Sequence, residues 1–271
     1  MFPLAICNEM FPEGDILPHA QELLAMGYSA VEIAPFTLAC YPELPSGDQL
    51  RDLRRRLEES GLRVLGLHWL LAKTDLHAAS PDPDTRARTV RYLGDLAAMC
   101  AELGGDVMVF GSPAQRSTPA GHNRADTLEL FTDTLARAAE LAGRQGVTIT
   151  LEPLAPAETD IVNTAEEALA VIERVGSRWL RLHLDCKAMQ AESEPREAVI
   201  RRFGKWLRSF HANDPNRLGP GMGDLDFRPV LEALEEVGYQ GYLSVEVFDF
   251  SPGPLEIARK SAEYLRSLMR R

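Results

Sequence analysis

The strongest constraint on the fold is a regular alternation of short apolar runs with longer stretches of helical periodicity. Each apolar run is rich in branched or aliphatic residues, which is typical of buried strands, and each is followed by a stretch with an apolar residue every three or four positions. Eight such runs occur along the 271 residues. They are Leu4–Cys7, Ala30–Ala34, Arg63–His68, Val107–Phe110, Val147–Leu151, Leu180–Leu184, Leu207–His211 and Tyr242–Val247.

The stretches between these runs have the period and length of amphipathic helices. They are Ile16–Met26, Gln49–Ser60, Thr85–Leu103, Asp126–Gln145, Ala165–Val175, Pro195–Phe203, Arg228–Val237 and Leu255–Met269. Six of the joints that follow a helical stretch carry a glycine, the residue that most readily ends a helix. These glycines are Gly27, Gly61, Gly104, Gly146, Gly176 and Gly238.

Strands that alternate with helices pair in parallel, because each connection must cross back over the sheet. Eight strand–helix units in a chain of this length predict a single (β/α)8 TIM barrel, an α/β fold that spans residues 1–271 as one domain. A doubly wound open sheet is the alternative. Its usual G-x-G-x-x-G turn does not follow the first run, which favours the barrel.

Composition excludes several classes of protein. The net charge of −11 opposes binding to nucleic acid or to an anionic membrane surface, and no apolar stretch is long enough to span a bilayer. We recognise no secretory signal, and the four scattered cysteines are typical of reduced thiols, so we expect a cytoplasmic protein. A homo-oligomer is also compatible with the sequence.

Four consecutive strands of the second half each end on a residue that can bind a metal. These residues are Glu152, Asp185, His211 and Glu246, separated by 33, 26 and 35 residues, or one strand–helix unit each time. In a parallel barrel the carboxyl ends of all strands meet at one mouth, where active sites are built. We therefore expect these four side chains to converge.

Three carboxylates that lie close together repel one another unless a cation intervenes. Three carboxylates and one imidazole suit Mn, Mg, Co or Fe, and less often Zn. Taken singly, each residue has a plainer interpretation: Asp185 could cap a helix, and His211 could be a hydrogen-bonded core histidine. Taken together, they predict one divalent metal ion. His183, two residues before Asp185, is better placed for a supporting hydrogen bond than for a ligand.

The same regions resemble a known family. The sequences LEPL at 151–154, HLD at 183–185, FHAND at 210–214 and SVEV at 244–247 resemble those of the xylose-isomerase-like sugar isomerases and epimerases, and within that group the ketose 3-epimerases. The resemblance implies that Glu152, Asp185, His211 and Glu246 bind one divalent metal. It also implies that Glu152 and Glu246 form an acid/base pair, and that Glu158 and Arg217 contact the substrate.

One position departs from the family pattern. The family has a sugar-binding histidine three residues after the metal-binding aspartate, where this chain has Ala188. Lys187 lies beside it and could contact an oxyanion or a carboxylate of the substrate, or could be a surface lysine. His68 and Glu32 also end strands at the expected mouth, where they could line the substrate site or serve packing.

The combined prediction is a metal-dependent sugar isomerase or epimerase that shifts a proton next to the carbonyl of a ketose or related polyol through an enediolate. Epimerisation and aldose–ketose isomerisation remain open. A lyase that dehydrates a keto-inositol or a dehydroshikimate-like acid is the main alternative, and a metal-stabilised binding protein without turnover is a second. We set aside the related apurinic-site endonucleases, because this acidic chain has few histidines at strand ends.

Overall fold

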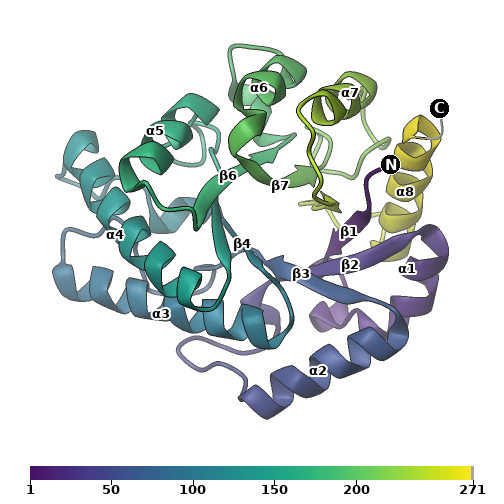
Figure 1. Cartoon of the computed structure of the whole chain (residues 1–271), viewed down its shortest axis with the longest axis horizontal. Helices are drawn as coiled ribbons and strands as arrows, with labels where there is room; N and C mark the ends of the chain where they lie inside the picture. Colours follow the sequence, from purple (N-terminus) through teal and green to yellow (C-terminus); the bar gives the residue numbers. More distant parts are fainter. Residues whose placement is uncertain (270–271) are drawn as a thin grey trace.

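The predicted barrel is present. In the computed structural model, which describes residues 1–269, eight parallel strands close in chain order, so that the last strand pairs with the first (Figure 1). Each strand matches a predicted apolar run to within a few residues. The strands are β1 Leu4–Cys7, β2 Tyr28–Ile33, β3 Arg63–Leu67, β4 Val107–Phe110, β5 Thr148–Leu151, β6 Leu180–Asp185, β7 Leu207–Ala212 and β8 Leu243–Val245.

The helices form a ring outside the strands (Figure 1). Their buried faces are apolar, as in α4, where Phe131, Leu135 and Ala138 are buried. This packing accounts for the 3.6-residue period of the sequence. The helices are α1 Ala20–Met26, α2 Gly47–Ser60, α3 Pro83–Glu102, α4 Arg124–Arg144, α5 Ala165–Val175, α6 Arg196–Phe203, α7 Arg228–Glu236 and α8 Pro254–Met269.

The sequence-based boundaries were wrong in two informative places. The first helical stretch begins as a short 3-10 turn, Leu17–His19, and becomes α-helical only at Ala20; Pro18 has no N–H to donate within this segment. The last strand ends at Val245, so Glu246 and Val247 lie beyond the ladder. This early end leaves Glu246 in the loop at the barrel mouth.

The glycine stops behave as predicted. All six glycines have positive φ, as shown by Gly27 at 98° and Gly61 at 91°, each of which follows its helix in the left-handed conformation. A side chain strains that conformation. These residues therefore end the helices sharply and return the chain to the next strand.

The barrel interior is polar in its second half. Thr150, His183 and Ser209 face inward, where the Ser209 hydroxyl lies 2.7 Å from His183 Nδ1 and 2.9 Å from Thr150 Oγ1. Because side chains alternate along a strand, the inward positions two residues further on are Glu152, Asp185 and His211. The hydrogen-bonded layer thus lies directly beneath the predicted site.

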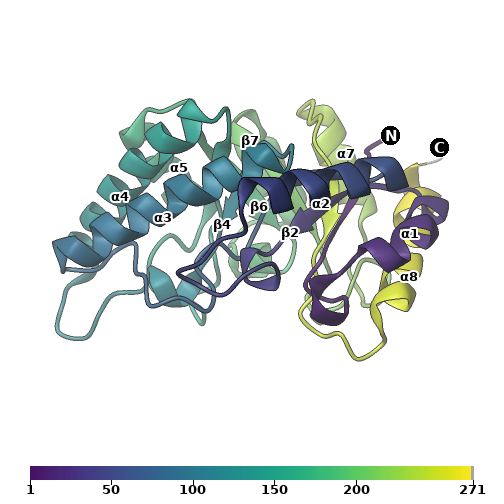
Figure 2. The same ribbon diagram turned by 90° about the horizontal axis from the view of Figure 1, so that it is seen from below.

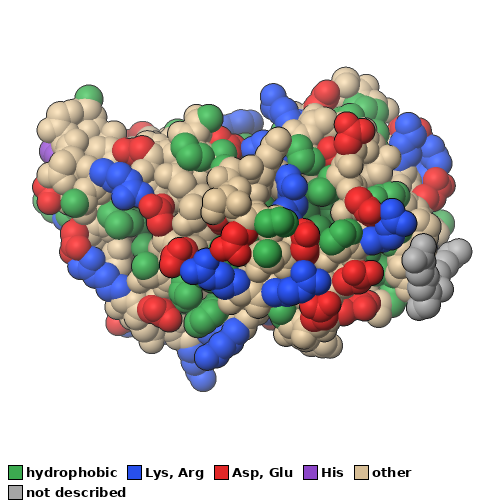
Figure 3. Space-filling model, turned by 90° about the horizontal axis from the view of Figure 1, so that it is seen from above, with side chains coloured by type: hydrophobic (Ala, Val, Ile, Leu, Met, Phe, Trp, Pro, Cys, Tyr) green, Lys and Arg blue, Asp and Glu red, His purple; other side chains and the backbone are tan. Residues whose placement is uncertain are grey.

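The face of the molecule in Figure 3 is not dominated by charge of one sign. Figure 3 shows Lys and Arg side chains interspersed with Asp and Glu over the face that it presents. The N-terminus lies beside α8 (Figures 1 and 2). Within residues 1–269, no helix is long and apolar enough to cross a membrane.

The pairing of β3 with β4 generates a stability prediction. Gly66 faces Val107 in the ladder, and a Cβ added at Gly66 would lie 2.1 Å from the Val107 carbonyl oxygen. Replacing a glycine within a strand normally raises the free energy of unfolding slightly. Here the close contact should make Gly66→Ala lower the free energy of unfolding by about 1–3 kcal/mol, as measured by urea denaturation. Gly47→Ala is the control, because its nearest neighbour is the flexible end of Arg51. Equal stability of both variants would contradict the close approach of β4.

Candidate active site at the barrel mouth

The four predicted metal-binding residues all stand at carboxyl ends of strands. Asp185 is the last residue of β6 and pairs in register with His211 of β7. Glu246 follows β8 and Glu152 follows β5. All four are at least nine-tenths buried. The barrel therefore brings together residues that are almost one hundred positions apart in the sequence.

Three of the four form a tight group. One donor atom each from Asp185, His211 and Glu246 lies within 4.8 Å of the others. Ligands of one divalent ion, each about 2–2.5 Å from it, lie within such a distance of each other, so this donor set fits a cation. Glu152 does not join this group, although it lines the same pocket. The register of β5 and β6 explains why Glu152 stands apart from Asp185. Leu151 pairs with Leu182, so Glu152 lies beside His183, and Asp185 is two residues further along β6.

The imidazole of His211 is held between two carboxylates. Its Nδ1 lies 3.1 Å from Glu246 Oε2, and its Nε2 lies 2.9 Å from Glu32 Oε2. Glu32 is 1% exposed and belongs to β2, so it orients the ring from the opposite side of the barrel. The sequence placed Glu32 at the mouth, but nothing in it identified His211 as its partner.

The pKa values of the buried carboxyl groups diverge. Burial and the carboxylates of Asp185 and Glu246 raise the pKa of Glu152 well above its usual value. Burial and Glu246 raise the pKa of Asp185 to about 6. Burial also disfavours ionisation of Glu246, but His211 and His68 outweigh it and lower the pKa. The site has more negative charge than its own histidines neutralise, which is a further reason that it suits a divalent cation.

Asp185 does not cap a helix, because the 3-10 turn Ala188–Ala191 that follows has Lys187 at its N-cap position and no capping side chain, but its carboxylate is held by two hydrogen bonds. Its Oδ1 accepts a hydrogen bond from the Ala188 N–H at 2.7 Å, and Oδ2 accepts one from Asn213 Nδ2 at 2.5 Å. These bonds fix the carboxylate orientation where the chain leaves β6. The helix-cap interpretation of Asp185 is therefore wrong, and its two hydrogen bonds leave the metal interpretation open.

Glu152 is positioned by two residues that the sequence analysis missed. Gly111 faces its carboxylate so closely that an added Cβ would lie 2.4 Å from Glu152 Oε2. Arg116 is fully buried, and its Nη1 donates to the Glu152 carbonyl oxygen at 2.7 Å. A buried arginine that binds backbone oxygens has no local sequence signature, because its partners lie about forty residues away.

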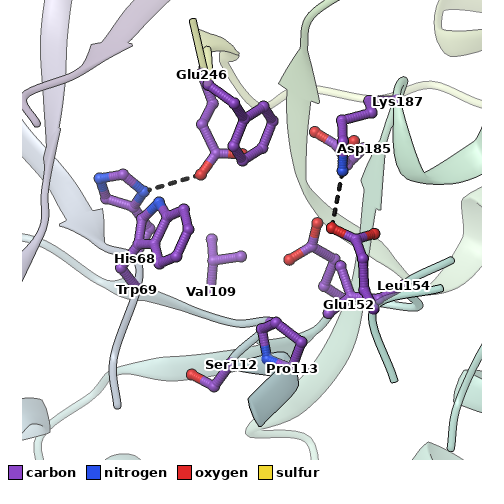
Figure 4. Close-up of a pocket in the computed structure, with 13 residues that line it drawn as sticks. His68, Trp69, Val109, Ser112, Pro113, Glu152, Leu154, Asp185, Lys187 and Glu246 are labelled. Carbon is purple, nitrogen blue, oxygen red and sulfur yellow. Dashed lines mark hydrogen bonds and ion pairs between the residues drawn. The ribbon is translucent and has the colours of Figure 1, made fainter. Parts of the chain in front are cut away.

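The pocket above these residues has polar and aromatic walls (Figure 4). Glu152 and Glu246 point into it from different sides. Trp69 and Phe248 also line it and form an aromatic rim, with ring centroids 6.2 Å apart. Lys187 Nζ lies 2.9 Å from Glu158 Oε1 and 4.7 Å from the Phe248 ring centroid. The pair of Lys187 and Glu158 supplies both donors and acceptors at the entrance, as sugar hydroxyls require.

The remaining predicted residues occupy different positions. His68 lines the pocket and lies 3.2 Å from Glu246 Oε1. His183 lies beneath the pocket, and its ring centroid is 4.2 Å from that of His211. Burial and the neighbouring His211 lower the pKa of His183, which favours the neutral ring. Arg217 is exposed outside the pocket, and its guanidinium donates to the carbonyl oxygen of Phe248 at 3.3 Å.

Comparison with known proteins gives a consistent result. A family model described as xylose isomerase-like TIM barrel matches residues 20–268. An L-ribulose 3-epimerase of Mesorhizobium japonicum is 31% identical over 222 residues, which cover 80% of this chain and 73% of the relative. A D-psicose 3-epimerase of Ruminiclostridium cellulolyticum is 26% identical over 240 residues, with 87% and 79% covered.

Solved structures share the fold. The structure of a D-psicose 3-epimerase with D-tagatose, from Clostridium cellulolyticum H10, has a TM-score of 0.84 at 21% identity, covering 99% of this chain and 98% of that one. A 3-keto-D-glucoside 4-epimerase from E. coli has a TM-score of 0.85 at 22% identity, covering 98% and 100%. At this level of identity, the likeness to these two structures shows that the barrel fold is shared and no more.

The contact between Glu32 and His211 predicts an effect on metal affinity. Glu32→Gln keeps an oxygen acceptor for His211 Nε2 but removes the charge that strengthens the bond, and such changes behind a metal-binding histidine typically cost 10–100-fold in affinity. We expect a loss of roughly that size in Mn²⁺ titrations by calorimetry. The exposed Glu22→Gln should bind as the wild type does. Unchanged affinity in Glu32→Gln would show that the contact does not support the ligand.

The raised pKa of Asp185 predicts the pH dependence of the metal-free protein. Its folded-state pKa of about 6 exceeds the ordinary 3.8, so folding binds the proton, and the associated stability is lost as the pH rises through about 6. Urea unfolding of chelator-treated protein should lose about 3 kcal/mol from this residue between about pH 3 and pH 7.

Asp185→Asn tests this effect, because it retains the acceptor for the Ala188 N–H and removes the ionisation. The variant should lose less stability over this pH range than the wild type does. An identical pH profile for the two proteins would assign the effect to other groups.

Proposed function

Because this chain belongs to the xylose isomerase-like TIM barrel family, we propose that it is a divalent-metal-dependent sugar epimerase that acts next to the carbonyl of a ketose. Among the characterised relatives, the L-ribulose and D-psicose enzymes are 3-epimerases, which favours epimerisation over isomerisation and dehydration. The native ion is Mn, Mg, Co or Zn.

One observation carries the proposal. Glu152 and Glu246 face the same pocket from different sides of the barrel (Figure 4). An epimerase must take a proton from one face of a carbon and return one to the other face. Two carboxylates on opposite sides of a bound substrate meet that requirement, and a binding protein would have no need of it.

The metal would be held by Asp185, His211 and Glu246, with Glu152 completing the set. A bound divalent ion polarises a carbonyl oxygen and so acidifies the neighbouring C–H bond. The chain supplies the orientation: Glu32 fixes the His211 ring, and Ala188 and Asn213 fix the Asp185 carboxylate.

The two glutamates then divide the proton transfer. In one direction, one carboxylate removes the proton from the substrate carbon, which leaves an enediolate, and the opposite carboxyl group donates a proton to the other face. In the reverse direction the roles exchange. In the metal-free protein, burial and the carboxylates of Asp185 and Glu246 raise the pKa of Glu152, whereas His211 and His68 lower that of Glu246, so the two carboxyl groups differ in proton affinity.

Substrate contacts come from the residues at the pocket entrance. We assign hydroxyl recognition to Glu158 and Lys187, with His68 on the opposite wall. Lys187 takes the place in recognition that the family gives to the histidine replaced here by Ala188. Arg217 acts on the same region through Phe248, whose carbonyl oxygen it contacts. Trp69 and Phe248 exclude water from the reacting end.

Glutamine at either acid/base position tests the mechanism. Glu152→Gln and Glu246→Gln keep the size of the side chain and one metal-binding oxygen but cannot accept the proton. We expect each to lower ketose epimerisation by at least ~10²-fold, the usual scale for loss of a positioned base. The exposed Glu140→Gln is the matched control and should retain full turnover.

Solvent exchange separates the two roles. In D₂O, each variant should still exchange the hydrogen of the reacting carbon for deuterium in one epimer of the substrate and not in the other, because only one face retains its base. Near-normal turnover in both variants would eliminate the acid/base pair and leave a metal-binding barrel.

A further inference from the structure

We propose a second divalent-cation site next to the first, formed by Cys7, Glu9, His68 and Glu246. One donor atom from each residue lies within 4.8 Å of the others. The four residues follow or end β1, β3 and β8, so the group occupies the opposite side of Glu246 from Asp185 and His211. The second site shares Glu246 with the acid/base pair and His68 with the substrate wall, so it rests on the proposed function through these two residues.

Polar atoms without partners point to an occupant. Within residues 1–269, Oε1 and Oε2 of Glu9 and Nε2 of His68 are buried and have no hydrogen-bond partner. The side chains of Glu9 and His68 are only 7% and 1% exposed. Their one contact is a 3.0 Å ion pair between His68 Nε2 and Glu9 Oε2 without hydrogen-bond alignment. Among the described residues, Glu9 Oε1 is left without any partner, which is costly for a buried carboxylate, and a cation between the two side chains would give each of these atoms a partner.

The contact geometry supports a cation rather than a hydrogen bond. His68 Nε2 and Glu9 Oε2 approach to 3.0 Å but lack hydrogen-bond alignment. On the other side of the ring, Nδ1 lies 3.2 Å from Glu246 Oε1. If Nδ1 carries the proton of a neutral ring, the lone pair of Nε2 faces the Glu9 oxygen, which is the arrangement of two ligands around one ion.

Glu246 connects the two sites through different oxygens. Its Oε2 faces His211, in the first site, whereas its Oε1 faces His68. In the arrangement described above, Oε1 accepts the Nδ1–H bond of His68 and so orients the ring whose Nε2 faces the second site, while Oε2 remains for the first site. The group Cys7, Glu32 and His211 is also compact, but there His211 Nε2 already bonds to Glu32 at 2.9 Å.

The donor types differ between the sites and predict selectivity. The first site has carboxylates and one imidazole, a set that hard ions such as Mn²⁺ accept. The second adds the sulfur of Cys7, whose Sγ is buried at the end of β1, and this suits Zn²⁺ or Co²⁺. We therefore expect Mn²⁺ to fill the first site alone and Co²⁺ to fill both.

The test uses Co²⁺, because a thiolate bound to it gives a charge-transfer absorption band in the near ultraviolet. Metal-free protein titrated with Co²⁺ should bind about two ions per chain and develop this band, whereas titration with Mn²⁺ should give about one bound ion per chain. Cys7→Ser should abolish the band, and Glu9→Gln should lose the second equivalent. Cys40→Ser is the matched control, because Cys40 is an exposed free thiol, and should retain both.

Asp185→Ala separates this proposal from the proposed function. It should remove the first equivalent and leave the thiolate band in place. A wild-type protein that binds one Co²⁺ without the band would overturn the second site, as would a second equivalent that persists in both Cys7→Ser and Glu9→Gln. Circular dichroism of the variants distinguishes loss of the site from loss of the fold. Failure of the first site would appear instead as Mn²⁺ binding that Asp185→Ala leaves unchanged.

Discussion

Repulsion between buried carboxylates governs the design of this barrel mouth. Glu152, Asp185 and Glu246 are withdrawn from water within one pocket, where like charges interact strongly because the surroundings screen them poorly. The chain compensates only in part, through His211 and His68, each of which contacts Glu246. The remaining negative charge is what makes the mouth receptive to a divalent ion. Burial and the neighbouring carboxylates raise the pKa of Glu152, whereas the two histidines lower that of Glu246, so the pKa values of the two glutamates diverge.

The rest of the molecule holds this unfavourable cluster in place. The apolar layers between strands and helices stabilise the barrel independently of the site. Within that frame, hydrogen bonds to Asp185 from Ala188 and Asn213 fix one carboxylate, and the buried Arg116 ties the backbone of Glu152 to the neighbouring loop. A site that costs folding free energy in this way can be retained only if elements remote from it supply the compensation.

The pocket combines this charged floor with a different kind of entrance. Trp69 and Phe248 form its apolar rim, while Lys187 and Glu158 neutralise one another within hydrogen-bonding distance. An entrance of this composition offers stacking surface and paired donors and acceptors, which suits polyhydroxylated ligands. Ala188 stands beside Lys187 at the position where the family pattern has a histidine, and its backbone N–H bonds to the Asp185 carboxylate.

The sequence alone determined the fold class and the strand-end residues, because the alternation of periods and the glycine stops are local properties that depend on neighbouring positions. It also placed Asp185, His211 and Glu246 at one mouth, since parallel strands must end together. Only the tertiary structure decided the stagger that sets Glu152 apart from that group, and only it paired Glu32 with His211, Arg116 with Glu152, and Glu9 with His68. Those contacts join strands and loops far apart in the chain, and barrel closure, which no local pattern encodes, brings them within reach.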